Sequence, residues 1–378
     1  MHKVSRRAVL AAGAMLPGLA WSAEPQRGTP PSVITTPPRD FSSGAPPVTA
    51  PDPDVLVLDK SFAPLLIAQE LVHRVHTGLE WAEGPAWSSQ GQYAVFSDVK
   101  GDAQYRYIWE TRQVTPFRRP SYNSNGNAFD FEGRQLSCQD FFRRVVRWEH
   151  DGSLKVLADN FEGKPLNSPN DLAPHPDGSV WFTDPPYGDQ LSEGHPNQSG
   201  EPMNEDGRFD PVIGNGGTGL IGGTRQAVPR NVYRWDPSGR LDVVVPEESG
   251  LLPNGICFSP DYRLVYLVRG SGLWVGDVQG PKVTNLRLFT DCMVDGVHCG
   301  PDGMRADRIG NIWSGSSANL GYSGVTVWNP AGKLIGRIRL PEVCANLCFA
   351  GPKRDWLFMC ATQSVYMLRV NIQGASPG

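Results

Sequence analysis

The sequence predicts an all-β fold, a six-bladed β-propeller with four-stranded blades and a long loop insertion in one blade. Glycine and proline are abundant among the 378 residues, at 42 and 34, and there are 11 tryptophans, a composition typical of turn-rich β proteins. A short segment ending in a polar turn recurs about every 45 residues, and further turns fall between the recurrences. Two hairpins in each unit make a four-stranded blade, and radial repetition of blades makes a propeller. A β-sandwich with accidental periodicity is the alternative.

Residues 1–23 have the pattern of an export signal. Ser5-Arg6-Arg7 precedes an apolar run that ends in the small residues before Ala23. Two adjacent arginines before a mild apolar stretch favour the twin-arginine route, with an ordinary secretory signal as the alternative. No segment after the signal reaches the length of about 18 apolar residues that a spanning helix needs. We therefore expect a periplasmic or secreted protein without a membrane span.

Residues 24–55 form a predicted linker or tail after the signal. This stretch is dense in proline, serine, threonine and glycine, so it cannot bury enough apolar surface to offset the entropy lost on ordering. An extended polyproline segment that wraps along the fold is the alternative. We expect the propeller domain to occupy residues 56–378.

Six segments align at their turns and define the six blades. They begin at Glu83, Asn125, Asn170, Asn254, Asp302 and Asn346. The interval between the third and the fourth segment is nearly twice the others. Residues 188–229 account for the excess, because this stretch is rich in glycine and polar residues and lacks sustained apolar alternation. We therefore expect a loop insertion there.

The first residue of every segment is a carboxylic acid or a carboxamide. Equivalent positions in a propeller are related by rotation about its axis, so we expect these six side chains to form a ring in the central channel. Two acids and four amides offer oxygen ligands, which suit a hard divalent cation. Ca²⁺ is the first choice, with Zn²⁺, Mg²⁺ and Mn²⁺ as alternatives. A purely turn-forming role for each residue is the competing interpretation.

The predicted metal ligands are two acids and two amides of this ring. Glu83 and Asp302 carry the negative charge that a dication needs. Asn170 and Asn254 are the expected neutral oxygen donors. Asn346, like Asn125, is expected to support these ligands or to face the substrate.

Four residues are expected to contact the substrate. They are Asn125 and Asn170 of the ring, and Asp184 and Tyr187, which lie between a third-blade strand and the insertion. A turn-forming role is the alternative for the last two. His298 is interpreted as a surface or capping histidine.

Four separated motifs, in the right order, carry a family resemblance. They are Glu83-Gly-Pro, Ser168-Pro-Asn170-Asp171, Pro253-Asn254-Gly and Pro301-Asp302-Gly-Met. On these motifs the chain resembles the senescence-marker-protein/gluconolactonase family of six-bladed calcium propellers. The stretch from Trp181 to Gly188 and the exported layout are most similar to bacterial gluconolactonases. The resemblance implies hydrolysis of a sugar lactone at a central divalent cation, with Glu83, Asn170, Asn254 and Asp302 at the metal positions.

Lactone hydrolysis requires an electrophile for the carbonyl, a water nucleophile and a group that transfers protons. A bound cation polarises the carbonyl, and a carboxylate acts as general base. We assign the base to Asp302 and the anchoring of the ion to Glu83; the reverse assignment stays open. The expected partner is a small sugar lactone.

Two other functions compete with lactone hydrolysis. One is cleavage of another ester or a phosphotriester on the same metal scaffold, and the other is a non-enzymatic binding platform. A nucleic-acid partner is not expected, because the formal net charge is −4 and no basic excess is present to neutralise phosphates. The seven cysteines include no Cys-x-x-Cys pair, which argues against a thiolate metal centre.

Overall fold

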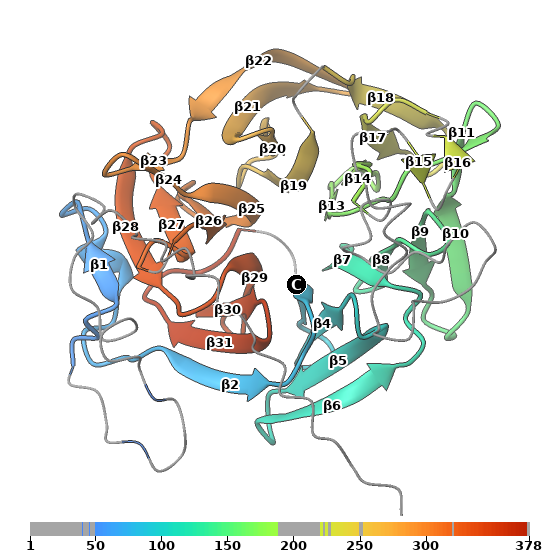
Figure 1. Cartoon of the computed structure of the whole chain (residues 1–378). Helices are drawn as coiled ribbons and strands as arrows, with labels where there is room; N and C mark the ends of the chain where they lie inside the picture. Colours follow the sequence, from blue (N-terminus) through green and yellow to red (C-terminus); the bar gives the residue numbers. More distant parts are fainter. Residues whose placement is uncertain are drawn as a thin grey trace, which may run out of the picture.

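The computed structural model describes residues 50–187, 228–248, 252–319 and 321–375, with residues 40 and 45 and the backbone of 220–221 and 224–225. Six antiparallel sheets stand in a ring around a central axis, like the blades of a propeller (Figure 1). This confirms the predicted fold class. The predicted signal at 1–23 lies outside the described residues.

Blades 1 to 4 are each built from strands in sequence order, beginning with the strand next to the axis. Blade 1 has β3 (Ala82–Ser88), β4 (Tyr93–Asp98), β5 (Ala103–Ile108) and β6 (Gln113–Arg118). Blade 2 has β7 (Ser124–Phe129), β8 (Gln135–Gln139), β9 (Arg144–Trp148) and β10 (Leu154–Ala158). Blade 3 has β13 (Leu172–Pro174), β14 (Val180–Thr183), β17 (Val232–Trp235) and β18 (Leu241–Val245). Blade 4 has β19 (Pro253–Phe258), β20 (Leu264–Arg269), β21 (Gly272–Gln279) and β22 (Lys282–Thr290).

Blades 5 and 6 each take a strand from the N-terminal part of the chain. Blade 5 has β25 (Gly300–Ala306), β26 (Ile312–Ser317), β27 (Gly324–Trp328) and β28 (Leu334–Arg339), with β1 (Val55–Val57) paired to β28 as a fifth strand. Blade 6 has β29 (Cys344–Ala350), β30 (Trp356–Ala361) and β31 (Ser364–Arg369), with β2 (His73–Thr77) as its outer strand. The ring is therefore closed by strands from the two ends of the chain.

Short elements lie between the blade strands. Three of them connect blades: the 3-10 turn η1 (Ala63–Leu65) and the paired strands β11 (Asn160–Phe161) with β12 (Lys164–Pro165) and β23 (Met293–Val294) with β24 (Val297–His298). The paired strands β15 (Leu220–Ile221) and β16 (Thr224–Arg225) lie within blade 3, between β14 and β17. In the described ranges, no helix has the length and apolar character needed to cross a membrane. Most of the insertion predicted at 188–229 lies outside the described residues. Its two ends follow β14 and precede β17, so it joins the second and third strands of blade 3.

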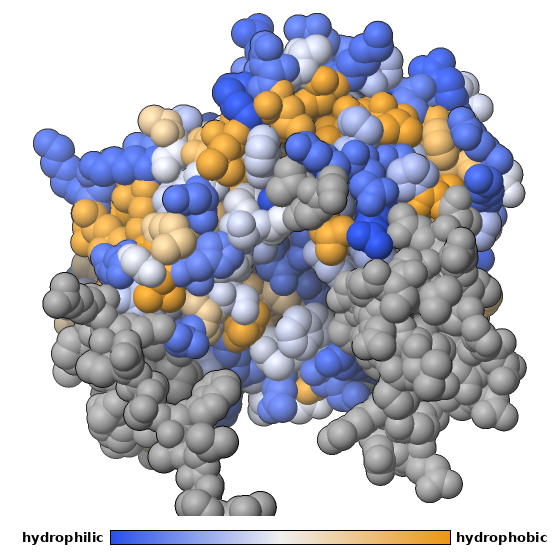
Figure 2. All heavy atoms as spheres, turned by 45° about the horizontal axis from the view of Figure 1, so that its top comes forward, coloured by the Kyte–Doolittle hydropathy of each residue, from blue (hydrophilic) through white to orange (hydrophobic). Residues whose placement is uncertain are grey.

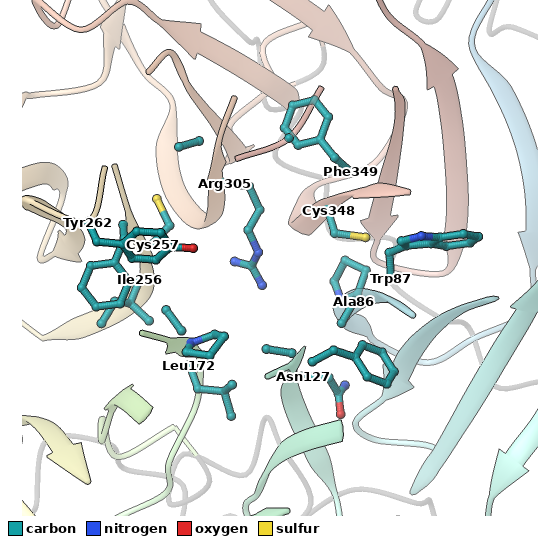
Figure 3. Close-up of a pocket in the computed structure, with 18 residues that line it drawn as sticks. Ala86, Trp87, Asn127, Leu172, Ile256, Cys257, Tyr262, Arg305, Cys348 and Phe349 are labelled. Carbon is teal, nitrogen blue, oxygen red and sulfur yellow. The ribbon is translucent and has the colours of Figure 1, made fainter. Parts of the chain in front are cut away.

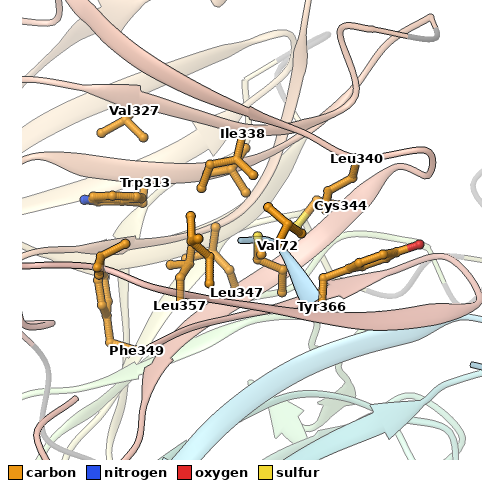
Figure 4. Packing of buried hydrophobic residues seen from close by; sticks show 14 of the residues in the cluster. Val72, Trp313, Val327, Ile338, Leu340, Cys344, Leu347, Phe349, Leu357 and Tyr366 are labelled. Carbon is orange, nitrogen blue, oxygen red and sulfur yellow. The ribbon is translucent and has the colours of Figure 1, made fainter. Parts of the chain in front are cut away.

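The core fills the spaces between neighbouring blades. Between blades 5 and 6, Trp313 packs against Phe349 with ring centroids 5.7 Å apart, and Ile338, Leu347 and Tyr366 complete a buried cluster (Figure 4). Burial of such side chains supplies the main stabilising free energy of the fold. On the face shown in Figure 2, hydrophobic and hydrophilic residues are interspersed.

The ordered chain begins before the expected domain boundary at residue 56. Asp52 and Asp54 are buried, although they belong to the stretch expected to be a linker. The Asp52 carboxylate accepts hydrogen bonds from the backbone N–H groups of Asp54 (3.0 Å) and Val72 (2.8 Å). The Arg339 guanidinium Nε lies 2.9 Å from the Asp54 carboxylate. The last residues of the expected tail therefore belong to the propeller, because paired polar groups hold them against blade 5.

Candidate metal and substrate site

The six aligned segments form the inner edges of the six blades. Each segment leads into an inner strand, and an antiparallel second strand follows, so all six inner strands run in one direction along the axis. The residues that open the segments therefore lie at one end of the channel, which we call the ring end. They are Glu83 on β3, Asn125 on β7, Asn170 just before β13, Asn254 on β19, Asp302 on β25 and Asn346 on β29.

Backbone contacts between neighbouring blades hold these positions close together. The Gly126 N–H donates to the Asn170 carbonyl at 2.8 Å, which joins blade 2 to blade 3. A Cβ atom on Gly84 would overlap the carbonyl oxygen of Asn125, and a Cβ on Gly303 would overlap the Asn346 side chain. Only glycine allows so close an approach between two backbones. The ring residues thus follow one another around the axis in blade order.

β-Bulges occur where the ring residues lie. The pairing between first and second strands shifts register between Glu83 and Ala86, and again between Pro301 and Met304. Blades 2 and 4 have the same irregularity at the equivalent place, and in blade 6 the register shifts between Cys344 and Asn346. A bulge bends its strand and changes the direction of the side chains beside it. Because the irregularity recurs in five blades, it orients the ring side chains in a similar way around the axis.

The two acids of the ring lie near each other around Cys344. Burial, followed by the charges of Asp302 and Glu83, holds the pKa of the Cys344 thiol well above its usual range. Burial also raises the pKa of Cys360, with Glu83 among the contributing charges. These thiols are therefore neutral, and they are unsuited to act as nucleophiles. All seven cysteines are buried and free of disulfides.

The donors at the ring end fit a hard cation better than a soft one. Across the described residues, no three His, Cys, Asp or Glu side chains gather in the manner of a metal centre. A cation bound here would take its remaining ligands from amide oxygens, as the sequence predicts. Glu83 is buried and Asp302 half-buried, and both contribute to the charge around Cys344. A dication between two such carboxylates would offset their mutual repulsion.

Asp184 is fully enclosed beside the loop that carries Asn170. Its carboxylate accepts a hydrogen bond from the Asn167 backbone N–H at 2.9 Å, and its own carbonyl accepts one from the Asn167 side chain. Burial raises the pKa of Asp184 to about 8. Direct contact with substrate stays a prediction for this residue and for the half-buried Tyr187.

A buried ion pair that the sequence analysis missed crosses the channel. Asp171 of blade 3 and Arg305 of blade 5 lie 3.4 Å apart, with side chains that are 1% and 10% exposed. Burial lowers the pKa of Arg305, but its neighbours together, Asp171 first among them, raise the pKa above its usual value. The repeat alignment contained the signal, because the residue three positions after each ring residue is Ala86, Ala128, Ala173, Cys257, Arg305 or Phe349. Arg305 is the one charged residue at that position.

A family model described as "SMP-30/Gluconolactonase/LRE-like region" matches residues 81–363. The chain belongs to this SMP-30/gluconolactonase family. The match begins just before the first ring residue and ends just before β31, so it covers most of the propeller and confirms the resemblance seen in the four motifs.

Individual members of the SMP-30/gluconolactonase family align over most of the chain. A gluconolactonase of Zymomonas mobilis is 28% identical over 327 residues, which cover 79% of this chain and 81% of the relative. The solved structure of a gluconolactonase from Xanthomonas campestris is similar with a TM-score of 0.69 and 27% identity, covering 86% of this chain and 98% of that one. Regucalcin from Agrobacterium tumefaciens, described as a calcium-binding protein, has a TM-score of 0.59 at 18% identity over 80% of this chain and 94% of its own. This last likeness shows the shared fold alone.

Proposed function

We propose that the chain is a lactonase that hydrolyses a sugar lactone of the gluconolactone type to the aldonic acid. The observation that supports the proposal is the ring end, where the inner strands of a gluconolactonase-family propeller carry two acids and four amides at equivalent positions and where both acids act on Cys344. Two relatives named gluconolactonases, each 27% or 28% identical, align over most of the chain and support this substrate class.

We propose that Glu83, Asp302, Asn170 and Asn254 hold a divalent cation, with Ca²⁺ as the first choice. Carboxylate and amide oxygens are the ligands that Ca²⁺ prefers, whereas the thiols near the ring are buried and neutral. When bound, the cation would polarise the lactone carbonyl and stabilise the negative charge that develops on its oxygen.

The residues of the chain itself would position the substrate and move the proton. Asp302, which is half-buried, takes a proton from water as the water oxygen bonds to the lactone carbonyl carbon. The ring C–O bond then breaks, and the proton passes to the leaving alkoxide, which gives a hydroxy acid. Asn125 and Asn170 orient the oxygens of the lactone, and Asp184 holds the loop that carries Asn170.

The central test is hydrolysis of a lactone panel by metal-free and metal-loaded protein. Purified protein stripped with EDTA is assayed by acid release on gluconolactone, an aryl ester and an organophosphate triester, before and after addition of Ca²⁺, Mg²⁺, Mn²⁺ or Zn²⁺. We expect gluconolactone turnover that EDTA abolishes and a cation restores. Preference for the triester or aryl ester would favour the other hydrolase function, and no turnover with any metal would favour a binding platform.

We also propose that the protein is exported. The twin-arginine pattern at residues 5–7 supports this location. Fractionation of the native cells, with Arg6→Lys and Arg7→Lys together as the comparison, tests it.

A further inference from the structure

A pocket in the channel lies at the end opposite to the ring. It is lined by residues two to four positions beyond the ring residues in every blade, among them Ala86, Asn127, Ile256 and Arg305 (Figure 3). Gly374 also lines it, close to where the Ala375 N–H bonds the Ala306 carbonyl at 3.0 Å. The last described residues of the chain therefore pass this far end. The pocket is distinct from the proposed lactonase site.

Arg305 dominates the chemistry of this pocket. Its guanidinium reaches into the middle of the space, between residues of opposite blades (Figure 3). Among the described residues that line the pocket, Arg305 alone carries a charge. Cys257 and Cys348 also line it, but burial raises the pKa of each thiol to about 12, so both are neutral. The remaining lining is mostly alanine, leucine, isoleucine, phenylalanine and proline.

The hydrogen-bond capacity of Arg305 is only partly used. Its Nη1 donates to the Met304 carbonyl at 2.7 Å and to Asp171 at 3.4 Å. Within the described part of the chain, Nε and Nη2 have no protein acceptor, although the residue is 9% exposed. A guanidinium has five N–H donors, and Nε and Nη2 of Arg305 are not among the enclosed side-chain atoms that lack a partner, so they face the open space of the pocket. The free edge formed by Nε and Nη2 is the edge that binds a carboxylate through two parallel hydrogen bonds.

We propose that this pocket binds a short aliphatic carboxylate, whose oxygens bond the Nε–Nη2 edge of Arg305 and whose methyl or ethyl group lies against the apolar wall. The pocket has a volume of about 50 Å³, which is room for roughly three or four water molecules or a ligand of similar size. Asp171 occupies only the Nη1 side of the guanidinium, so a ligand need not displace it. Propionate matches this combination of a planar anion and a small apolar end.

Calorimetric titration of the full chain with propionate, and with propionamide as its neutral isostere, tests the proposal. We expect propionate to bind and propionamide to bind at least about tenfold more weakly, which corresponds to the loss of one charge-assisted hydrogen bond. A crystal soaked in propionate should show its carboxylate on Arg305. Equal binding of the two compounds, or ordered water only in the pocket with no heat of binding, would overturn the proposal.

Two variants keep the test independent of the buried ion pair. Arg305→Lys leaves a cation beside Asp171 but removes the planar two-donor edge, and Ala86→Leu fills the pocket without changing any charge. Each should weaken propionate binding at least about tenfold while circular dichroism shows a folded protein. Arg308→Lys, an exposed arginine at the neighbouring turn, is the matched control and should bind as the wild type does. Unchanged binding in both pocket variants would contradict the assignment, and because binding is measured directly, the result does not depend on lactonase activity.

Discussion

At the scale of single residues, the proposal assigns general-base catalysis to Asp302 and the anchoring of the cation to Glu83. We expect Asp302→Ala to lower kcat for gluconolactone by at least about 100-fold, because general-base catalysis commonly contributes that much. Asp261→Asn, a change in a turn at the far end of blade 4, is the control and should keep full activity. Turnover is measured by acid release, and circular dichroism checks the fold.

The assignment of the base to Asp302 rather than Glu83 is also open to test. Glu83→Gln should lower the amount of bound metal more than it changes the pH profile of the remaining activity, since we assign Glu83 to the anchoring of the ion. Elemental analysis of the two purified variants, combined with pH–rate profiles, separates the roles. Loss of the acidic limb of the profile in Glu83→Gln, with Asp302→Ala still active, would reverse the assignment.

We expect Asp184 to make the stability of the protein depend on pH. Burial raises its pKa to about 8, whereas an unfolded aspartate titrates near 3.8. Between these values the unfolded chain releases the proton and the folded chain keeps it, so this residue lowers stability as pH rises from about 4 to about 8. Asp184→Asn should remove that loss, so the free energy of unfolding should fall less from pH 5 to pH 8 than in the wild type, by on the order of 1 kcal/mol for each pH unit. Urea titrations at both pH values measure the effect, and an identical pH dependence in both proteins would contradict it.

Functional residues were predictable where the same residue type recurs at one aligned position of the repeats. They were missed where a residue differs from its counterparts in the other repeats. The six acids and amides were found because they occupy one aligned position. Arg305 was missed although it stands among Ala, Cys and Phe at its own aligned position, because similarity between the segments does not mark a residue that occurs in one segment alone. Its partner Asp171 comes from a segment 134 residues away, and no local pattern links the two.

At the scale of elements, the glycine beside each of several ring residues permits neighbouring inner strands to touch. Gly84 has φ +49°, and a Cβ there would overlap the Asn125 carbonyl, whereas Gly78 has φ +99° with open space around it. We expect Gly78→Ala to cost about 1–2 kcal/mol of unfolding free energy for the positive φ alone. Gly84→Ala should cost about 1–3 kcal/mol more, because the backbone of blade 2 must move. Urea denaturation of the pair gives the difference, and equal losses would show that the contact is not limiting.

The N-terminal segment is fastened to blade 5 by one buried and one exposed ion pair. Asp54 and Arg339 are both buried, whereas Asp59 pairs with Lys333, which is 63% exposed. Asp54→Ala should destabilise the protein by about 3–5 kcal/mol, because it leaves Arg339 buried without its partner. Asp59→Ala, the matched surface change, should cost no more than about 1 kcal/mol. Thermal and urea unfolding compare the two, and similar losses would contradict the importance of the buried pair.

At the scale of the whole molecule, the number of blades and the site of the insertion were predictable from the sequence, but the pairing of N-terminal strands with blades 5 and 6 was not. Each blade consists of hairpins formed by residues close in sequence, so the spacing of turns along the chain predicts the blades. Strands β1 and β2 pair with strands β28 and β31, which lie more than 270 positions later in the chain. The residues 50–55 were assigned to a tail because their prolines and aspartates are typical of linkers, and only the three-dimensional partners of Asp52 and Asp54 reveal their place in the fold.

The sheet of blade 6 is completed when β2, an early strand, pairs with β31, which lies near residue 370. During synthesis, β31 leaves the ribosome long after β2, so the propeller ring closes late. Until β31 is available, the sheet of blade 6 has an unpaired edge on which other chains could pair. A stop codon that removed only β31 would leave β2 without its neighbour and the circle open. The export proposed above, by a route that carries folded proteins, would suit a propeller whose closing strand is synthesised late.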